Sequence, residues 1–218
     1  MDKYEIFDRL NFKKLNETVI DDIPAQPGIY FFKLSKNSKF ESFENDRNDR
    51  ILYIGKHEKS IRTRLFENHL NDGSKMSKYN FSTFRRSVGA ILKNKLDLNS
   101  SPRISRETGK INSYSIYSFS KLKKIGEKDK FYLYDFENFD CETKLNEWIT
   151  SNLEFSFLTK DELSIQNDLK DIEFKIRNLF KPCLNCNFDD DYNIYRDEIK
   201  RMRKVCNNEA RLNYIDKV

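Results

Sequence analysis

Hydrophobic side chains first gather in two short runs that have the composition of β-strands. Residues 27–34 (PGIYFFKL) open with a turn dipeptide and continue with aromatic and β-branched residues, and residues 51–55 (ILYIG) repeat that character. The polar stretch between them, residues 35–50, is expected to be a solvated loop. We therefore predict a β-hairpin. A second pair of strands is predicted over residues 111–119 and 131–136, around a lysine-rich turn.

Apolar residues recur at helical spacing in much of the remaining chain. Ser60 is a favourable N-cap for a helix over residues 61–70, which the sequence NDG at residues 71–73 ends. Residues 1–26 have the pattern of a short amphipathic leader. Further helices are predicted over residues 84–96, 141–155, 168–180 and 192–206.

The overall composition is that of one folded domain, but its charge is unevenly distributed. The chain has 218 residues, of which 34% are charged and 14% aromatic, and its net charge is +5. Residues 75–130 hold 14 Lys and Arg against four acids, whereas residues 131–191 hold 14 acids against six bases. A contiguous basic excess is typical of a surface that meets a phosphate backbone, although a solvated surface gives the same pattern.

Several classes of protein are excluded by what the chain lacks. No secretory signal and no apolar stretch of transmembrane length is found, so we expect a soluble, intracellular protein in the cytoplasm with no membrane partner. The four cysteines are expected to be reduced thiols. Two histidines are too few for a three-His zinc site and leave little room for a Ser-His-Asp triad. Chemistry must rest mainly on Tyr, Lys, Arg, Glu and Asp.

The two predicted strands carry a recognisable pair of motifs. Residues 28–30 are Gly-Ile-Tyr and residues 53–55 are Tyr-Ile-Gly, followed by Lys56, a helical arginine, Glu173 and Asn185 in that order. This arrangement resembles the GIY-YIG nuclease family. The resemblance implies an α/β (α+β) fold in which helices flank a small, mainly antiparallel central sheet. It also implies hydrolysis of phosphodiester bonds in DNA, with Mg²⁺ or Mn²⁺ as cofactor.

The resemblance assigns roles that the chemistry of each side chain supports. Tyr30 would help to activate water, and because a phenol is a poor base near neutral pH, Lys56 would lower its pKa. Tyr53 would order the nucleophile or the phosphate. Glu173 suits a single hydrated Mg²⁺ and is the predicted metal ligand, although an ion pair with Arg177 along its helix is the alternative. Asn185 would organise the site.

The catalytic arginine is either Arg62 or Arg64. Counted at 100° per residue, the two flank the same apolar stripe of the helix on opposite sides. Members of the family place the arginine before an apolar helix residue, as Arg64 precedes Leu65, so Arg64 is chosen. Many members also have a His or Tyr four residues later, which here is Asn68, and the same count puts His69 on the side of Arg62. His69 is thus either an auxiliary acid or base or an ordinary half-exposed histidine.

Double-stranded DNA is the expected partner, met by a catalytic domain over residues 27–190. An N-terminal extension over residues 1–26, an inserted basic segment over residues 75–130 and a C-terminal basic helix over residues 191–218 complete the chain. A homodimer on DNA, or two sequential visits by one site, would allow both strands to be cut. The residues expected to contact DNA are Arg62, Arg85, Arg86, Lys121, Lys123, Lys124 and Arg201.

Two other functions fit parts of the sequence. A nucleic-acid-binding module could keep the fold without cutting, and it would bind DNA with a steep salt dependence. A zinc-stabilised interaction protein could be built on Cys183 and Cys186, with Cys141 and Cys206 as distant ligands, although small buried or idle thiols are the favoured explanation of these residues. The sequence does not distinguish a restriction-like role from repair or the mobility of a genetic element.

Overall fold

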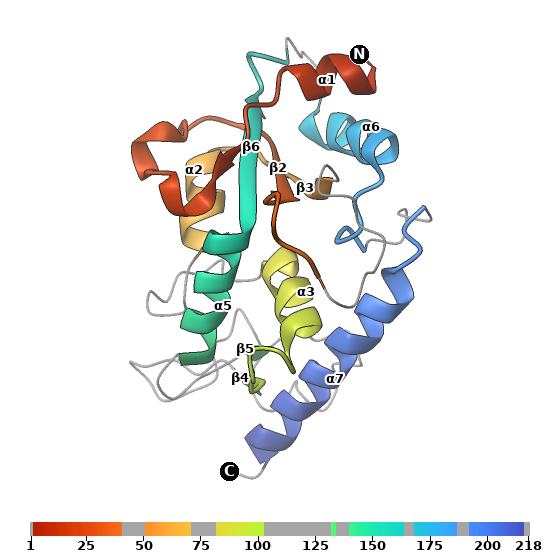
Figure 1. The fold of residues 1–218 in the computed structure, drawn as a ribbon. Helices are drawn as coiled ribbons and strands as arrows, with labels where there is room; N and C mark the ends of the chain where they lie inside the picture. The colour runs from red at the N-terminus through yellow and green to blue at the C-terminus, as the bar shows by residue number, and fades with distance from the viewer. Residues whose placement is uncertain are drawn as a thin grey trace.

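An antiparallel sheet forms the centre of the molecule. The computed structural model describes residues 2–40, 51–70, 82–102, 132–133, 140–163, 168–186 and 192–215 (Figure 1). The main sheet has the strand order β1-β6-β2-β3, and a small second sheet pairs β4 (Ser101–Pro102) with β5 (Tyr132–Leu133). The expected α/β fold with a small antiparallel sheet and flanking helices is confirmed. The strands of the main sheet are β1 (Lys13–Lys14), β2 (Gly28–Leu34), β3 (Ile51–His57) and β6 (Leu153–Thr159).

The predicted hairpin is present as β2 and β3. The two strands are antiparallel, with Tyr30 opposite Gly55 and Phe32 opposite Tyr53. Residues directly opposite one another in an antiparallel pair project to the same face of the sheet. The hairpin therefore places both motif tyrosines on one face.

Strand β6, which lies between β1 and β2, is the element that the sequence pattern did not predict. The helix expected over residues 141–155 ends at Asn152 (α5, Asp140–Asn152), and the chain passes directly into β6. β6 pairs with β2 over its whole length, from Gly28 opposite Thr159 to Leu34 opposite Leu153. Aromatic residues such as Phe155 suit a pleated interior strand, and this tertiary position overrides the helical continuation.

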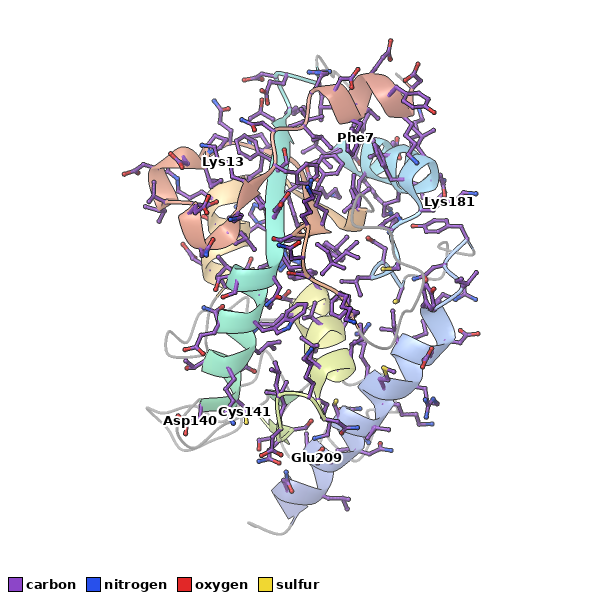
Figure 2. All side chains as sticks on the ribbon, in the orientation of Figure 1. Phe7, Lys13, Asp140, Cys141, Lys181 and Glu209 are labelled. Atoms are coloured by element: carbon purple, nitrogen blue, oxygen red, sulfur yellow. The ribbon has the colours of Figure 1, made fainter. Side chains whose placement is uncertain are left out.

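Helices cover both faces of the sheet. The face that carries Tyr30 and Phe32 packs against α2 (Ile61–Thr63), the π-helical turn η3 (Arg64–His69), α3 (Thr83–Leu92) and α5. Within this core the rings of Phe32 and Phe84 stack with centroids 4.2 Å apart. The opposite face, which carries Ile29 and Phe31, packs against α6 (Leu169–Phe180) and α1 (Lys3–Asp8). Figure 2 shows side chains filling the space between the ribbons.

Both ends of the chain belong to this packing. The first 26 residues, expected as an extension, contribute α1, β1 and the short 3₁₀ turns η1 (Leu15–Glu17) and η2 (Ile20–Asp22), and bury Ile6, Leu15 and Ile23. The N-terminal segment therefore packs with the rest of the described chain. At the other end, α7 (Arg196–Ile215) packs beside α3 and β4 (Figure 1). None of the described helices has both the length and the apolar character needed to cross a membrane.

The remaining predicted elements have mixed outcomes. The helix over residues 168–180 is confirmed as α6, capped by the Asp168 side chain. The helix over residues 84–96 is confirmed as α3, although its last α-helical residue is Leu92. The helix over residues 192–206 begins later and runs further, as α7. The strand predicted over residues 111–119 lies outside the described residues, as does most of the one over residues 131–136.

Candidate active site

The site is built around Tyr30, whose ring crosses the neighbouring strand at Gly55. A Cβ atom added to Gly55 would lie 2.3 Å from the Tyr30 hydroxyl oxygen and 2.4 Å from its Cζ atom. No side chain fits there while the ring keeps its position. The glycine of the second motif is therefore required by the tyrosine of the first.

Two nitrogen atoms converge on the Tyr30 hydroxyl. Arg64 Nε donates to it at 3.1 Å, and His69 Nε2 lies 2.8 Å from it. Both side chains come from one stretch of chain, Arg64–His69, that forms a π-helical turn. Tyr30 is only 1% exposed, so this phenol is bonded by protein groups rather than by bulk water.

The π-helical winding explains how residues five positions apart meet the same atom. Leu70 N–H donates to the carbonyl of Leu65, five residues back, at 2.9 Å. In an α-helix, residues five apart are rotated by about 140° from each other. The wider turn instead brings His69 to the side of Arg64. The expectation that His69 shares a side with Arg62 is therefore wrong, because it assumed α-helical winding.

The same turn settles which arginine lies at the tyrosines. Arg62 Nε donates to the carbonyl of Ile23 at 2.7 Å, and its guanidinium lies 3.6 Å from Asp21. Arg62 thus holds the N-terminal segment. Arg64 hydrogen-bonds Tyr30, and its Nη1 donates to Asn68 Oδ1 at 3.3 Å.

Tyr53 completes an aromatic cluster with Tyr30 and His69. Its ring centroid lies 6.2 Å from that of Tyr30 and 6.1 Å from that of His69. Burial raises the pKa of Tyr53, which is 8% exposed, and the Arg64 charge acts against this rise. Both motif tyrosines therefore lie within the electrostatic influence of one guanidinium.

Burial dominates the electrostatics of this cluster. It raises the pKa of both Tyr30 and Tyr53, and the negative charge of Glu173 raises them further, while Arg64 acts in the opposite direction. Burial also lowers the pKa of His69 well below its usual range, an effect that the Arg64 and Arg85 charges reinforce. At neutral pH the cluster therefore holds neutral phenols and a neutral imidazole beside a guanidinium cation.

Glu173 acts on the cluster through its charge. It is half-buried on α6, which packs on β3, and its charge acts on both tyrosines. Among the described residues, no three His, Cys, Asp or Glu side chains gather as a metal-binding group. A single carboxylate suits Mg²⁺ or Mn²⁺, which keep most of their water ligands, better than it suits an all-protein zinc cage.

Asn185 acts as a substitute strand at the open edge of the sheet. Its Oδ1 accepts from Ile54 N–H at 2.9 Å, and its Nδ2 donates to the Ile54 carbonyl at 2.8 Å. Beside it, Leu184 N–H donates to the carbonyl of Leu52 at 2.8 Å. The segment after α6 is thereby fixed along β3 at Leu52 and at Ile54, the middle residue of the second motif. Asn185 is 3% exposed and holds the backbone of that motif.

Lys56 is not placed as predicted. Strand alternation points its side chain to the face opposite Tyr30, and it forms an ion pair with Glu58. The cation that bonds the Tyr30 hydroxyl is Arg64. The expectation that Lys56 lowers the pKa of Tyr30 is therefore not supported by its position.

Of the residues expected to contact DNA, Arg85 is buried in an ion pair. It is 6% exposed, its Nε donates to Glu142 Oε2 at 2.7 Å, and its Nη2 donates to the Glu142 carbonyl at 2.7 Å. Arg86 is also buried. These positions correct the prediction, because neither guanidinium faces solvent where a phosphate could meet it. Arg201 is exposed on α7, whereas Lys121, Lys123 and Lys124 lie outside the described residues.

Three polar residues near the tyrosines escaped the sequence prediction. Ser82 contacts the His69 ring, and Asn68 accepts a hydrogen bond from Arg64. Burial lowers the pKa of His57, and the Arg64 charge lowers it further. His57 follows Gly55 by two residues on the same strand, a spacing that could have indicated its face. Ser82 and Asn68 depend on helix packing and π-helical winding, for which the sequence carries no comparable pattern.

The cysteines do not gather into a site. All four are buried thiols, and Asn193 Nδ2 lies 3.7 Å from Cys186 Sγ. Figure 2 places Cys141 at the start of α5, far from Lys181, which is two residues before Cys183. Cys141 is therefore separated from the pair at 183 and 186. The described residues support packing thiols rather than a zinc centre.

Comparison with known families agrees with this geometry. A family model described as the GIY-YIG catalytic domain matches residues 28–205, which include both motifs, the π-helical turn, Glu173 and Asn185. Neither the comparison with curated proteins nor that with solved structures gave a match. The matched region covers most of the chain and begins at the glycine of the first motif. The protein is thus a member of the GIY-YIG nuclease family.

Proposed function

We propose that this nuclease is a metal-dependent endonuclease that hydrolyses phosphodiester bonds in DNA. The observation that carries the proposal is the convergence on Tyr30. One phenolic oxygen is bonded by Arg64 and His69, and the charge of the Glu173 carboxylate acts on it. A guanidinium bonded to a phenol, with a carboxylate whose charge acts on that phenol, supplies groups suited to bind a phosphate and to orient a water molecule against it.

Each side chain of the site has its own role in the proposed reaction. Tyr30 orients the attacking water. Arg64 stabilises the charge that grows on the phosphate, because its planar guanidinium donates to two acceptors at once. Tyr53, whose ring lies beside that of Tyr30, orders the phosphate relative to the water. Lys56 is partly exposed on the edge strand and is a candidate contact to a neighbouring phosphate.

Glu173 would hold the divalent cation. When bound, that cation supplies positive charge at the phosphate and offsets the carboxylate charge that now raises the pKa of both phenols. Asn185 supports this arrangement because it fixes the β3 backbone at Ile54, between Tyr53 and Gly55.

The duplex is expected to lie partly on the exposed basic face of α7. Lys200, Arg201 and Lys204 are exposed there. Contacts of this kind are to phosphates and carry no sequence preference. A restriction-like role and a homodimer on DNA belong to the same proposal. Sedimentation that finds only monomers on cleaved DNA would remove the dimer.

The test is cleavage of supercoiled plasmid in Mg²⁺, in Mn²⁺ and in EDTA. Nicked or linear products that need the cation, and that disappear in both Glu173→Gln and Tyr30→Phe, are expected. Asp171→Asn is the matched control, because Asp171 is an exposed carboxylate on the same helix. Each variant is checked by its thermal unfolding midpoint.

The outcomes separate the candidate functions. Binding without any products, on plasmid and on branched DNA, would favour the non-cleaving module. Cleavage that persists in Glu173→Gln at unchanged cation affinity would remove Glu173 as the metal ligand.

A further inference from the structure

We propose that Ser82 is a positioning residue that fixes His69 in the tautomer with its proton on Nε2. His69 then donates a hydrogen bond to Tyr30 and does not accept the Tyr30 proton. The tautomer follows from the contacts alone. Its consequence for cleavage rests on the proposed nuclease function.

Ser82 joins the first turn of α3 to the imidazole. It is the N-cap of α3, and its Oγ accepts from Arg85 N–H at 2.9 Å. The same Oγ lies 2.6 Å from His69 Nδ1. Ser82 is 2% exposed and His69 is fully buried, so water does not satisfy either group.

Counting donors and acceptors decides the direction of this contact. A serine hydroxyl has one hydrogen to donate, and the Ser82 oxygen already accepts from the helix backbone. Within the part of the chain that the structure describes, His69 Nδ1 is the acceptor that this buried hydrogen meets. Because a buried donor is normally paired, Ser82 donates to Nδ1. A neutral imidazole has a single N–H, which is therefore on Nε2.

The other end of the imidazole is consistent with this assignment. Nε2 then donates to the Tyr30 oxygen, which also accepts from Arg64 Nε. The Tyr30 hydroxyl hydrogen is then not directed at either nitrogen. Each contact from Ser82 Oγ through His69 to the Tyr30 oxygen then pairs one donor with one acceptor. The reverse tautomer would leave the Ser82 hydrogen unpaired and would turn the Tyr30 hydrogen toward His69.

The backbone of His69 is fixed by the same helical turn. Arg85 Nη1 donates to the His69 carbonyl at 3.0 Å, and the Arg85 guanidinium is in turn held by Glu142 and Asn146 of α5. The first turn of α3 thus holds both the ring and the main chain of His69. This is the function that the structure gives to Arg85 in place of DNA contact.

Two N–H donors on one phenolic oxygen have a defined chemical effect. They stabilise negative charge on that oxygen more than they stabilise the neutral phenol. Other charged or titratable groups at the cluster are Tyr53 and His57 on β3, Arg64 on η3, Arg85 on α3 and Glu173 on α6. Fixing His69 as a donor therefore favours the charged form of Tyr30.

The direct test is ¹⁵N nuclear magnetic resonance of protein labelled at histidine. The chain has only two histidines, so His57→Gln assigns both imidazoles. His57 is an internal reference, because its Nδ1 accepts from Ser60 N–H at 2.8 Å and so carries no proton. We expect His69 to show an unprotonated Nδ1 and a protonated Nε2. A protonated Nδ1 in the wild-type protein would overturn the proposal.

Two variants then test the positioning role. Ser82→Asp keeps an N-cap acceptor for α3 but has no hydrogen to donate, so it should move the His69 proton to Nδ1. Loss of one hydrogen-bond donor to the Tyr30 oxygen should slow cleavage on the order of 100-fold. Ser82→Thr keeps the hydroxyl and should retain both the wild-type tautomer and the rate. Thermal unfolding checks that each variant is folded.

The remaining outcomes are also decisive. If Ser82→Asp reverses the tautomer and cleaves at the wild-type rate, Ser82 has no positioning role in catalysis. If the wild-type protein cleaves no DNA, the proposed function fails, while the ¹⁵N spectrum still decides the tautomer.

Discussion

Adding a single methyl group at Gly55 should disable the site by displacing Tyr30. In Gly55→Ala the new Cβ would lie 2.3 Å from the Tyr30 oxygen, whereas ordinary contacts begin at 3.4 Å. The ring must therefore retreat by about 1 Å, a misplacement that can cost about 100-fold in rate. Its hydrogen bonds with Arg64 and His69, at 3.1 and 2.8 Å, would be lost or lengthened.

The same substitution should also destabilise the fold, although only by a modest amount. Overpacking a core typically costs about 1–3 kcal/mol. Replacing a strand glycine with alanine otherwise gains about 0.5–1 kcal/mol. The two effects oppose each other, so we expect a net loss of about 1–2 kcal/mol in the free energy of unfolding.

A double-mutant cycle with Tyr30→Leu isolates the contact. Leucine lacks the distal ring atoms that the new Cβ would meet, so in that background Gly55→Ala should be neutral or stabilising. Urea unfolding measures the four free energies, and single-turnover cleavage measures the rates of wild type and Gly55→Ala. An equal loss of stability in both backgrounds, or wild-type cleavage by Gly55→Ala, would refute the reasoning.

Three further predictions concern buried polar groups. Arg85→Met should lower the free energy of unfolding by about 3–5 kcal/mol because it leaves Glu142 charged and unpaired. Adding Glu142→Leu should recover most of this loss. Equal urea midpoints for the single and the double variant would contradict the prediction. Stability should be greatest between about pH 6.5 and pH 10. Below that window the unfolded chain takes up a proton that His69 resists in the folded state, and above it the unfolded chain loses one that Tyr30 retains. Urea unfolding across pH should show a shallower acid limb in His69→Gln and a shallower alkaline limb in Tyr30→Phe. Asn185→Asp cannot donate to the Ile54 carbonyl, so it should lower the free energy of unfolding by about 1–3 kcal/mol. The kcat of the folded fraction should stay unchanged. A lower kcat at unchanged stability would show instead that Asn185 has a direct catalytic role.

The parts of the fold that depend on local pattern were predictable. Strands β2 and β3 follow from runs of aromatic and β-branched residues, and α6 follows from its apolar stripe and the Asp168 cap. β6 was missed because it continues directly from α5 with no loop between them, and its strand character comes from its place between two other strands. That place is a property of the assembled sheet.

In the site, too, the features that follow from local sequence pattern were predictable and those that depend on the assembled fold were not. The motifs identified the tyrosines and the family, which the family comparison confirms. Angular counting failed at His69 because one π-helical turn changes the direction of every residue after it. Charge alone suggested DNA contact for Arg85, whose partner Glu142 is 57 residues further along the chain. Partners so distant in sequence leave no local pattern.

The late position of β6 in the chain has a consequence for synthesis on the ribosome. The hairpin that carries both tyrosines is complete at His57, but β6, which must pair with β2, begins at Leu153. At ordinary rates of translation the intervening stretch of about 95 residues takes about 5–20 s to emerge. During that time one edge of β2 lacks its partner strand, and its unpaired backbone N–H and C=O groups are open to other chains. Production of active nuclease should therefore depend on chaperones that bind nascent chains, and the phenol at the centre of the site is enclosed only after most of the protein has been made.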